Sequence, residues 1–358
     1  MKKKLLSVLI LSTSLIGVSY ADYQDGLNAY IKSDYKAAIS EWKLSADVKS
    51  LNALAKLYRL GEGVPSDNQE AFKWYRKAAI LGSTKAQFNL GLIYFNGDGA
   101  LKDYKKAAKW YRKSADQGNV RAQYNLGIMY DYGQGVLKDY KEAIKWYRKA
   151  ANQGNAKAQY NLGLMHILGL GTLKDIRQAV ELFAKSADQG DADAQSYLAL
   201  MYLNGIGVLK DYKEAIKWYR KAANQGNAKA QYNLAVMYSL GQGTLKNDKQ
   251  AAKWFEKAAD QGNADAQYNL GLMYELGGGV LKNDKQAIKW YLKAANQGDD
   301  RAQFHLGLIY GNGLSELKDY KQAAKWFKKA ADQGDTIAQY NLDLIYEFDK
   351  GVLKSDKH

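Results

Sequence analysis

The stretch DYKEAIKWYRKAANQGNAKAQYNL occupies residues 139–162 and recurs letter for letter at residues 211–234. Weaker copies fill the sequence between and around these two with a period of 36 residues. One 36-residue grid, with His166 in its one non-tyrosine slot, comprises Tyr58, Tyr94, Tyr130, Tyr202, Tyr238, Tyr274, Tyr310 and Tyr346. A second grid, with Leu182 in its one non-aromatic slot, comprises Trp74, Trp110, Trp146, Trp218, Trp254, Trp290 and Trp326. Such self-similarity predicts one array of stacked repeats.

Each repeat is expected to hold two amphipathic helices. In NVRAQYNLGIMYDYG, from residue 119, apolar residues recur at helical spacing behind Asn119, which is placed to cap the helix. Gly133 should end this helix A, and Asp139 should cap helix B, which runs through DYKEAIKWYRKAANQG to Gly154. Neither helix can bury its apolar face alone, so the all-α fold must be a solenoid in which repeats cover one another.

A slot in the middle of helix A holds small residues in every repeat before the last. Its occupants are Ala55, Gly91, Gly127, Gly163, Ala199, Ala235, Gly271 and Gly307. Glycine costs a helix about 1 kcal/mol relative to alanine, so we expect a neighbouring helix to lie against the backbone here. Asp343 occupies the slot in the last helix A, where no further helix is expected to cover it.

The first 21 residues differ from the repeats. Lys2 to Lys4 precede the apolar run LLSVLILSTSLIGV, and small residues precede Ala21. This is the pattern of a secretory signal peptide, and its apolar run is too short for a membrane anchor. We therefore expect cleavage after Ala21 and a periplasmic or secreted protein that is not transmembrane once the signal is removed.

The composition limits the partners of such a protein. The formal charge is +15, or +12 without the three lysines of residues 1–21. A basic exported chain attracts anionic lipid, envelope polymer or acidic protein, whereas nucleic acid is not expected as a partner. The absence of cysteine excludes disulfides, and the three histidines have no metal-ligand spacing, so no metal or cofactor is expected. His166, in the tyrosine slot, should be a packed imidazole.

With these residues in view, the chain resembles the Sel1-like repeat family, relatives of the tetratricopeptide repeats. The resemblance rests on A-x-x-x-LG-x-x-Y, the G-x-G-V loop and the KA-WY-x-KAA helix, as in AQYNLGIMYDYGQGVLKDYKEAIKWYRKAA at residues 122–151. It implies antiparallel A/B helix pairs in a right-handed superhelix whose A helices line a concave groove, and a role as a scaffold for protein contacts. We expect a capping helix pair at 22–49, eight repeats at 50–335, and a last helix A and tail at 336–358.

By resemblance to the tetratricopeptide repeats, one helix A slot and the residue four positions later should point into the groove. The candidate partner-binding residues, called the ladder below, are Phe88, Tyr124, Ile128, Tyr160, Leu164, Tyr232, Val236, Tyr268, Leu272 and Phe304. Charges of both signs should line its rim, at Lys85, Arg121, Lys157, Asp193, Lys229, Asp265 and Arg301. The predicted ligand is an extended or helical peptide with acidic and apolar residues. The alternative is that this face serves only packing between A helices.

The residue that follows each member of the tyrosine series differs in chemical type from repeat to repeat. It reads Phe95, Asp131, Ile167, Leu203, Ser239, Glu275, Gly311 and Glu347. These side chains are either free to meet a partner or have drifted at an exposed position.

Two further functions remain open. The lysines of the B helices could bind an anionic envelope polymer or membrane surface, in a salt-dependent way. A β-lactamase-like hydrolase is the remote alternative, because S-x-x-K occurs at Ser33 and Ser315, and Ser66 begins S-D-N. K-T-G is absent, and Asp67 belongs to the series of helix caps, so we expect no enzymatic activity. The G-x-G pairs lack a preceding strand and recur with the period, as loop glycines do.

Overall fold

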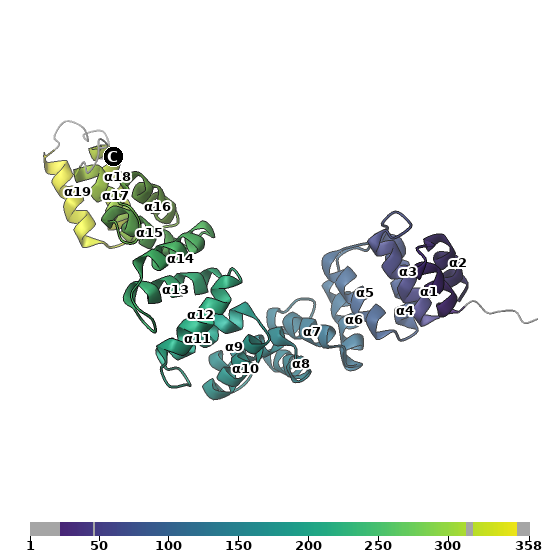
Figure 1. Cartoon of the computed structure of the whole chain (residues 1–358). Coiled ribbons are helices and arrows are strands. Elements are labelled where there is room, and N and C mark those ends of the chain that lie inside the picture. The colour runs from purple at the N-terminus through teal and green to yellow at the C-terminus, as the bar shows by residue number, and fades with distance from the viewer. Residues whose placement is uncertain (1–21, 46, 313–317, 349–358) are drawn as a thin grey trace, which may run out of the picture. The chain divides into compact units, whose positions relative to one another are not determined.

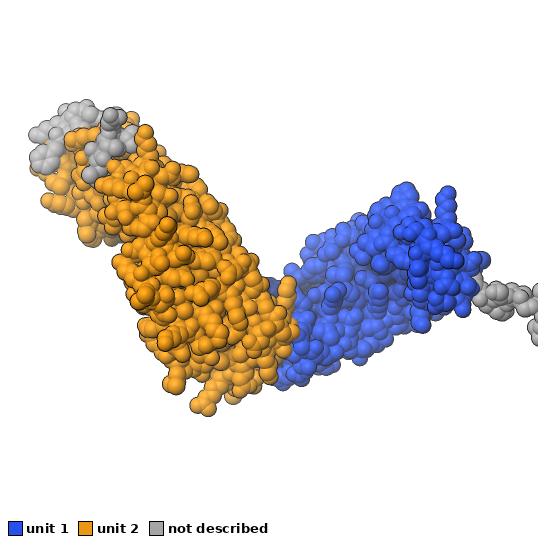
Figure 2. All heavy atoms as spheres, in the orientation of Figure 1, with its two compact units in different colours: residues 1–155 blue, residues 156–358 orange. Residues whose placement is uncertain are grey.

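The computed structural model describes residues 22–45, 47–312 and 318–348, and all regular structure in them is α-helical (Figure 1). The chain falls into two compact units, residues 1–155 and 156–358 (Figure 2). Within each unit, helices alternate between an A set and a B set, and each helix packs on the one before and after it. The expected all-α solenoid of 36-residue repeats is confirmed.

The helices have nearly uniform lengths. The two helices of the expected capping pair are α1 (Tyr23–Ile31) and α2 (Tyr35–Ser45). The A helices are α3 (Val48–Leu60), α5 (Thr84–Asn96), α7 (Val120–Tyr132), α9 (Ala156–Leu168), α11 (Ala192–Asn204), α13 (Ala228–Leu240), α15 (Ala264–Leu276), α17 (Asp300–Asn312) and α19 (Thr336–Phe348). The B helices are α4 (Asn68–Ile80), α6 (Tyr104–Asp116), α8 (Tyr140–Asn152), α10 (Ile176–Asp188), α12 (Tyr212–Asn224), α14 (Asp248–Asp260), α16 (Asp284–Asn296) and α18 (Tyr320–Ala331).

Capping residues set the helix ends, as the sequence predicts. The Asn119 side chain accepts a hydrogen bond from the backbone N–H of Ala122, and the Asp139 side chain accepts from the first turn of α8. Gly133 ends α7 in the left-handed conformation, with φ of 70°. Each A–B loop is then closed by a further bond, such as that from the Asp139 N–H to the Tyr130 carbonyl at 2.9 Å.

At the small-residue position of helix A, an aromatic ring of the neighbouring B helix lies against the backbone. A Cβ added at Gly127 would lie 2.6 Å from Cδ1 of Tyr147, which comes from the B helix of the same repeat. Tyr147 is fully buried. A neighbouring helix thus lies against the backbone here, as expected, and it does so through an aromatic ring that fills the space that glycine leaves. Ala199 and Ala235 are fully buried in the same slot, so the ring can also sit against a methyl group.

Hydrogen bonds between glutamine side chains join successive repeats. The sequence analysis did not predict them. In six repeats a buried glutamine of helix A donates to a carbonyl near the end of the preceding B helix. Its own side-chain oxygen accepts a hydrogen bond from a second glutamine 30 positions later, as from Gln261 to Gln231 at 2.7 Å. In the first repeat, Leu51 and Leu81 occupy the positions of the two glutamines, so both members of the pair are replaced together.

Replacing one glutamine of a hydrogen-bonded pair should destabilise the fold more than replacing both. Gln231→Leu leaves the Gln261 amide without its acceptor and removes the donor to the Ala223 carbonyl. We expect the free energy of unfolding to fall by about 1–3 kcal/mol. The double variant Gln231→Leu/Gln261→Leu copies the leucine pair of the first repeat and should recover part of the loss. Urea unfolding followed by circular dichroism measures both, and a double variant less stable than the single one would contradict the coupling.

Candidate functional site

The ladder residues are half-buried in both units, and their rings lie against the B-helix rings. The six aromatic members each pack on an aromatic residue of the following B helix, with ring centroids 5.8–6.0 Å apart. The pairs are Phe88–Tyr111, Tyr124–Tyr147, Tyr160–Phe183, Tyr232–Phe255, Tyr268–Tyr291 and Phe304–Phe327. Part of each ring therefore supports the fold, and part remains accessible on the A-helix face. The aliphatic members Ile128, Leu164, Val236 and Leu272 are half-buried as well.

In the first unit this face holds a cavity of about 540 Å³ between α3, α4, α5 and α7. Phe88, Leu92 and Ile93 supply its apolar wall. The exposed guanidinium groups of Arg59 and Arg121 belong to the same lining. Apolar surface beside two cations suits a ligand that combines an apolar side chain with a carboxylate.

In the second unit an additional ring extends the ladder at α11. Tyr197 stacks on Phe183, with centroids 5.5 Å apart and an interplanar angle of 25°. It also meets Tyr160 edge to face at 5.7 Å. Its neighbour Ser196, in the regular ladder slot, is buried. Three rings from α9, α10 and α11 thus form one cluster on the A-helix face.

A second cluster of the same geometry lies between α15, α16 and α17. His305 stacks on Tyr291 at 5.1 Å and 25°, and meets Tyr268 edge to face at 5.7 Å. The imidazole Nδ1 lies 3.1 Å from a carboxylate oxygen of Glu275, which also accepts from the Tyr291 hydroxyl at 2.5 Å. The hydrogen bond from His305 lowers the pKa of Glu275, against the opposing effect of burial.

Sequence reasoning missed both clusters, although a signal for them existed. The motif YNL reads SYL at residues 196–198 and FHL at residues 304–306. Where asparagine stands in this slot, as at Asn233, its amide bonds to a carbonyl of its own helix. A ring in place of asparagine instead reaches the preceding repeat, so these two departures from the repeat mark places where the face is more aromatic.

The rim charges are all exposed, but two of them are paired. Arg301 bonds to Asp265 of the preceding A helix at 2.6 Å and to Asp299 at 2.5 Å. These hydrogen bonds raise the pKa of Arg301, whose guanidinium also lies over the Tyr268 ring at 4.4 Å. Asp193 accepts a bond from Asn227 at 2.8 Å.

The other predicted rim charges are cationic. Lys85 lines a cavity of about 370 Å³ together with Lys49, Lys56 and Glu62, near the capping pair. Arg121 belongs to the larger cavity of the first unit. Lys157 and Lys229 are exposed at the same slot of α9 and α13.

The residue after each tyrosine of the 36-residue series is half-buried in seven repeats, and Glu347 is exposed. Asp131 is half-buried and accepts from the Tyr147 hydroxyl at 3.3 Å, and burial raises the pKa of its carboxyl group. Phe95 packs edge to face on Tyr104 at 5.1 Å. Asp131 and Phe95 thus have partners within the fold, which neither expectation described.

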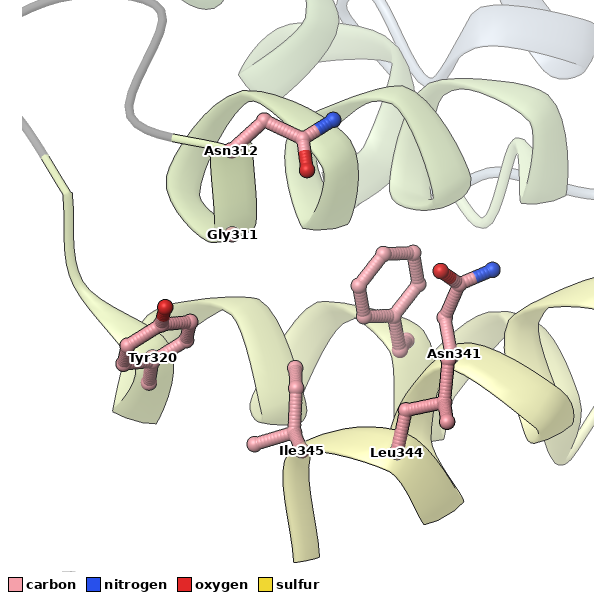
Figure 3. Close-up of a pocket in the computed structure, with 7 residues that line it drawn as sticks. Gly311, Asn312, Tyr320, Asn341, Leu344 and Ile345 are labelled. Atoms are coloured by element: carbon pink, nitrogen blue, oxygen red, sulfur yellow. The ribbon is translucent and has the colours of Figure 1, made fainter. Parts of the chain in front are cut away.

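Where this slot holds glycine, a cavity of about 470 Å³ opens between α17, α18 and α19 (Figure 3). Gly311 and Asn312 lie on one side, and Leu344 and Ile345 of α19 on the other. Phe327 contributes a ring from α18. A Cβ added at Gly311 would make only ordinary contacts, 3.6 Å from Ala323 and 3.8 Å from Phe327.

The residues of the serine motifs have structural roles in the turns. Ser33 lies in the turn between α1 and α2, outside either helix, with φ of 61°. Ser66 donates to the Arg59 carbonyl at 3.0 Å, and Asp67 caps α4. Ser315 lies outside the described residues. Within the described part of the chain no three His, Asp or Glu residues gather as a metal site would require, and His166 is buried.

The predicted signal peptide at residues 1–21 lies outside the described residues. Among the helices that are described, none combines the length and the apolar character needed to cross a membrane.

Similar proteins agree with the repeat reading. The Sel1 repeat model matches residues 48–83, 84–119, 120–155, 156–191, 192–227, 228–263, 264–299 and 300–335. A protective antigen of uropathogenic Escherichia coli that displays an SLR fold is 38% identical, with a TM-score of 0.82. The match covers 86% of this chain and 66% of that one, so this chain spans just under two thirds of the antigen's length.

A Sel1 repeat protein from Oxalobacter formigenes is 32% identical, with a TM-score of 0.65, and the match covers 96% of this chain and 97% of that one. No curated protein matches the chain. Eight repeat matches cover residues 48–335 without a gap. The chain therefore belongs to the Sel1 repeat family of helical scaffold proteins.

Proposed function

We propose that the chain is an exported, non-enzymatic scaffold that holds a segment of a partner protein against its A-helix face. A scaffold must offer an accessible surface that its own fold does not consume. The ladder meets this condition, because every member is half-buried rather than enclosed. Rings with one edge in the fold and the other accessible are the side chains that dominate protein interfaces.

The cavity of the first unit carries the proposal. Its apolar wall of Phe88 and Leu92 would hold an aliphatic or aromatic side chain of the partner. Arg59 and Arg121 would each hold a carboxylate, and Asp98 is the one acid in the lining. This arrangement supports an acidic and apolar peptide as the ligand, in line with the expectation from the sequence.

The second unit supports contact over a wider surface. Its two three-ring clusters present tyrosine hydroxyl groups and an imidazole beside apolar faces. Tyr268 is covered on one face by Arg301, so a partner there would meet a polar edge. Such mixed surfaces favour proteins over small apolar molecules.

Binding of an anionic envelope polymer through the B helices is the second candidate. Lys141, Lys145 and Lys149 of α8 are exposed. In seven repeats, however, the lysine three residues after the B-helix tryptophan lies over that tryptophan. Its ammonium nitrogen is 4.0–4.6 Å from the ring centroid. These lysines have a packing role that explains their presence without a ligand.

Peptides selected from a random library against the purified chain would test the proposal. Arg121→Glu reverses an exposed charge at the cavity, and Leu92→Asn makes its wall polar. We expect each variant to weaken the selected peptide at least about tenfold, which corresponds to about 1.4 kcal/mol. Lys145→Glu on the outer face of α8 is the matched charge reversal, and it should change the affinity less than about twofold.

The opposite pattern would reject the A-helix face. If Lys145→Glu abolished binding while Arg121→Glu and Leu92→Asn did not, the B helices would hold the ligand. Steep loss of affinity with salt would then support the envelope polymer. Circular dichroism of each variant should match the parent, because all three positions are exposed or half-buried.

A further inference from the structure

Six leucines project into solvent from the same place in successive A–B loops. Each is 88–92% exposed, which is far more than the rest of the apolar residues in the repeats. They are Leu101, Leu137, Leu173, Leu209, Leu245 and Leu281. A single exposed leucine needs no explanation, but a row at one slot forms an apolar edge. Four members belong to the second unit.

A second apolar side chain accompanies this row in three loops of the second unit. Leu168, Leu240 and Leu276 end their A helices and are 62–72% exposed. In the intervening loop Ile206 is also exposed. Each of the four loops therefore presents two apolar side chains to solvent.

A lysine follows every leucine of the row. In the second unit these are Lys174, Lys210, Lys246 and Lys282, all exposed. Lys210 lies over the ring of Tyr212 at 4.7 Å. Leucine, lysine and tyrosine together are the side chains that enter the interface of a bilayer, where the apolar part inserts and the ammonium group stays at the headgroups.

The four loops of the second unit lie along one edge of the stack. Consecutive A and B helices pack against each other and have equal lengths of 13 residues, so the A–B loops gather on one edge and the B–A turns on the other. The loops are held firmly. The Asn247 N–H bonds to the Tyr238 carbonyl at 2.9 Å, and Gly243 lies against the backbone of Tyr212 in the preceding repeat.

The fold itself does not require leucine at this slot. Pro65 occupies it in the first repeat and is exposed as well. The residue directly before this slot varies among alanine, valine and threonine in the described loops. This half-buried neighbour has thus changed between repeats, whereas the exposed Leu–Lys pair is the same in the six loops from Leu101 to Leu281.

From these observations we propose that the A–B loop edge of the second unit docks on an anionic phospholipid surface. Residues 168–178, 204–214, 240–250 and 276–286 hold eight basic and five acidic side chains, a net charge of +3. Two of the acids, Asp175 and Asp211, are helix caps whose carboxylates accept backbone N–H groups. Anionic headgroups would meet the lysines while the leucines enter the acyl boundary.

A lipid surface fits this edge better than a protein does. A protein partner would need a separate pocket for each leucine at the spacing of the repeats, whereas a bilayer receives all of them at once. The edge is also distinct from the A-helix face, which would stay open to a partner when the protein is docked.

Vesicle co-sedimentation tests the proposal. The chain from Asp22 onward, which contains every described helix, would be mixed with vesicles of phosphatidylcholine and phosphatidylglycerol at 3:1, and with phosphatidylcholine alone. We expect binding to the mixed vesicles to be the stronger. Leu173→Ser, Leu209→Ser, Leu245→Ser and Leu281→Ser combined should lower the partition coefficient at least about 100-fold.

Two further variants separate the contributions. Lys174→Gln, Lys210→Gln, Lys246→Gln and Lys282→Gln combined should remove the preference for the anionic vesicles. The matched control combines Leu44→Ser, Ile80→Ser, Leu81→Ser and Ile337→Ser, which changes four exposed apolar residues outside the A–B loops. It should alter the partition coefficient by less than about threefold.

Three results would overturn the proposal. The first is failure of the unmodified chain to bind the mixed vesicles. The second is equal binding by the four-leucine variant. The third is leucine-dependent self-association without vesicles, measured by sedimentation velocity, which would make the edge an interface between copies of the chain. Because the selected peptide should still bind the four-leucine variant, failure here is distinguishable from failure of the proposed scaffold function.

Discussion

Trp218→Ala is expected to lower the free energy of unfolding by about 3–5 kcal/mol. Trp218 is 7% exposed and belongs to the largest core cluster, which spans α10 to α16. Lys221 covers its outer face, with the ammonium group 4.0 Å from the ring. Truncation therefore leaves a cavity and also removes the cation–π contact. Urea unfolding fitted with a nearest-neighbour model for repeats would measure the change.

The chain provides its own control for this prediction. Leu182 occupies the tryptophan slot of α10 and is 6% exposed, so the fold accepts an aliphatic side chain there. Trp218→Leu should therefore lose less than half of the stability that Trp218→Ala loses. Equal losses for the two variants would mean that volume in this slot does not matter.

Much of the fold could be predicted from the sequence because it depends on local chemistry. Asn119 and Asp139 identify helix starts by the hydrogen bonds that their side chains can accept. Gly133 identifies a helix end by its left-handed backbone. The 36-residue period then specifies how many times the pair is repeated, and each copy covers the apolar face of the next.

The details of the site depended on contacts between repeats, which a period does not specify. Tyr197 and His305 matter because of the rings that they meet in the preceding repeat, and nothing within their own helices indicates those partners. The hydrogen-bonded glutamine pairs also depend on contacts between repeats. Its signal was the joint change to Leu51 and Leu81, which is visible only when two slots are compared.

The exposed loop leucines and the half-buried ladder illustrate two different uses of apolar residues. Tyr232 of the ladder packs on Phe255 and is partly accessible, so its role in the fold and its availability to a partner overlap. Leu245 is 88% exposed and contributes little to packing. A change at Leu245 should therefore affect binding alone, whereas a change at Tyr232 should affect both binding and stability.

Gly243→Ala is expected to destabilise the chain by about 2–5 kcal/mol. Gly243 has φ of 70°, which is unfavourable for any residue with a Cβ. The added Cβ would also lie 2.2 Å from the carbonyl oxygen of Tyr212, the first residue of α12 in the preceding repeat. A backbone atom cannot rotate away as a side chain can, so the loop must move off the repeat that it contacts.

Gly262→Ala separates these two causes. Gly262 has φ of 89°, but no atom lies within 4 Å of its added Cβ. Only the backbone strain remains, and this should cost about 1–2 kcal/mol. The excess for Gly243→Ala therefore measures the contact between repeats. If both variants lost the same stability in urea unfolding, the close approach of this loop to α12 would be unimportant, and the glycine would serve only the turn.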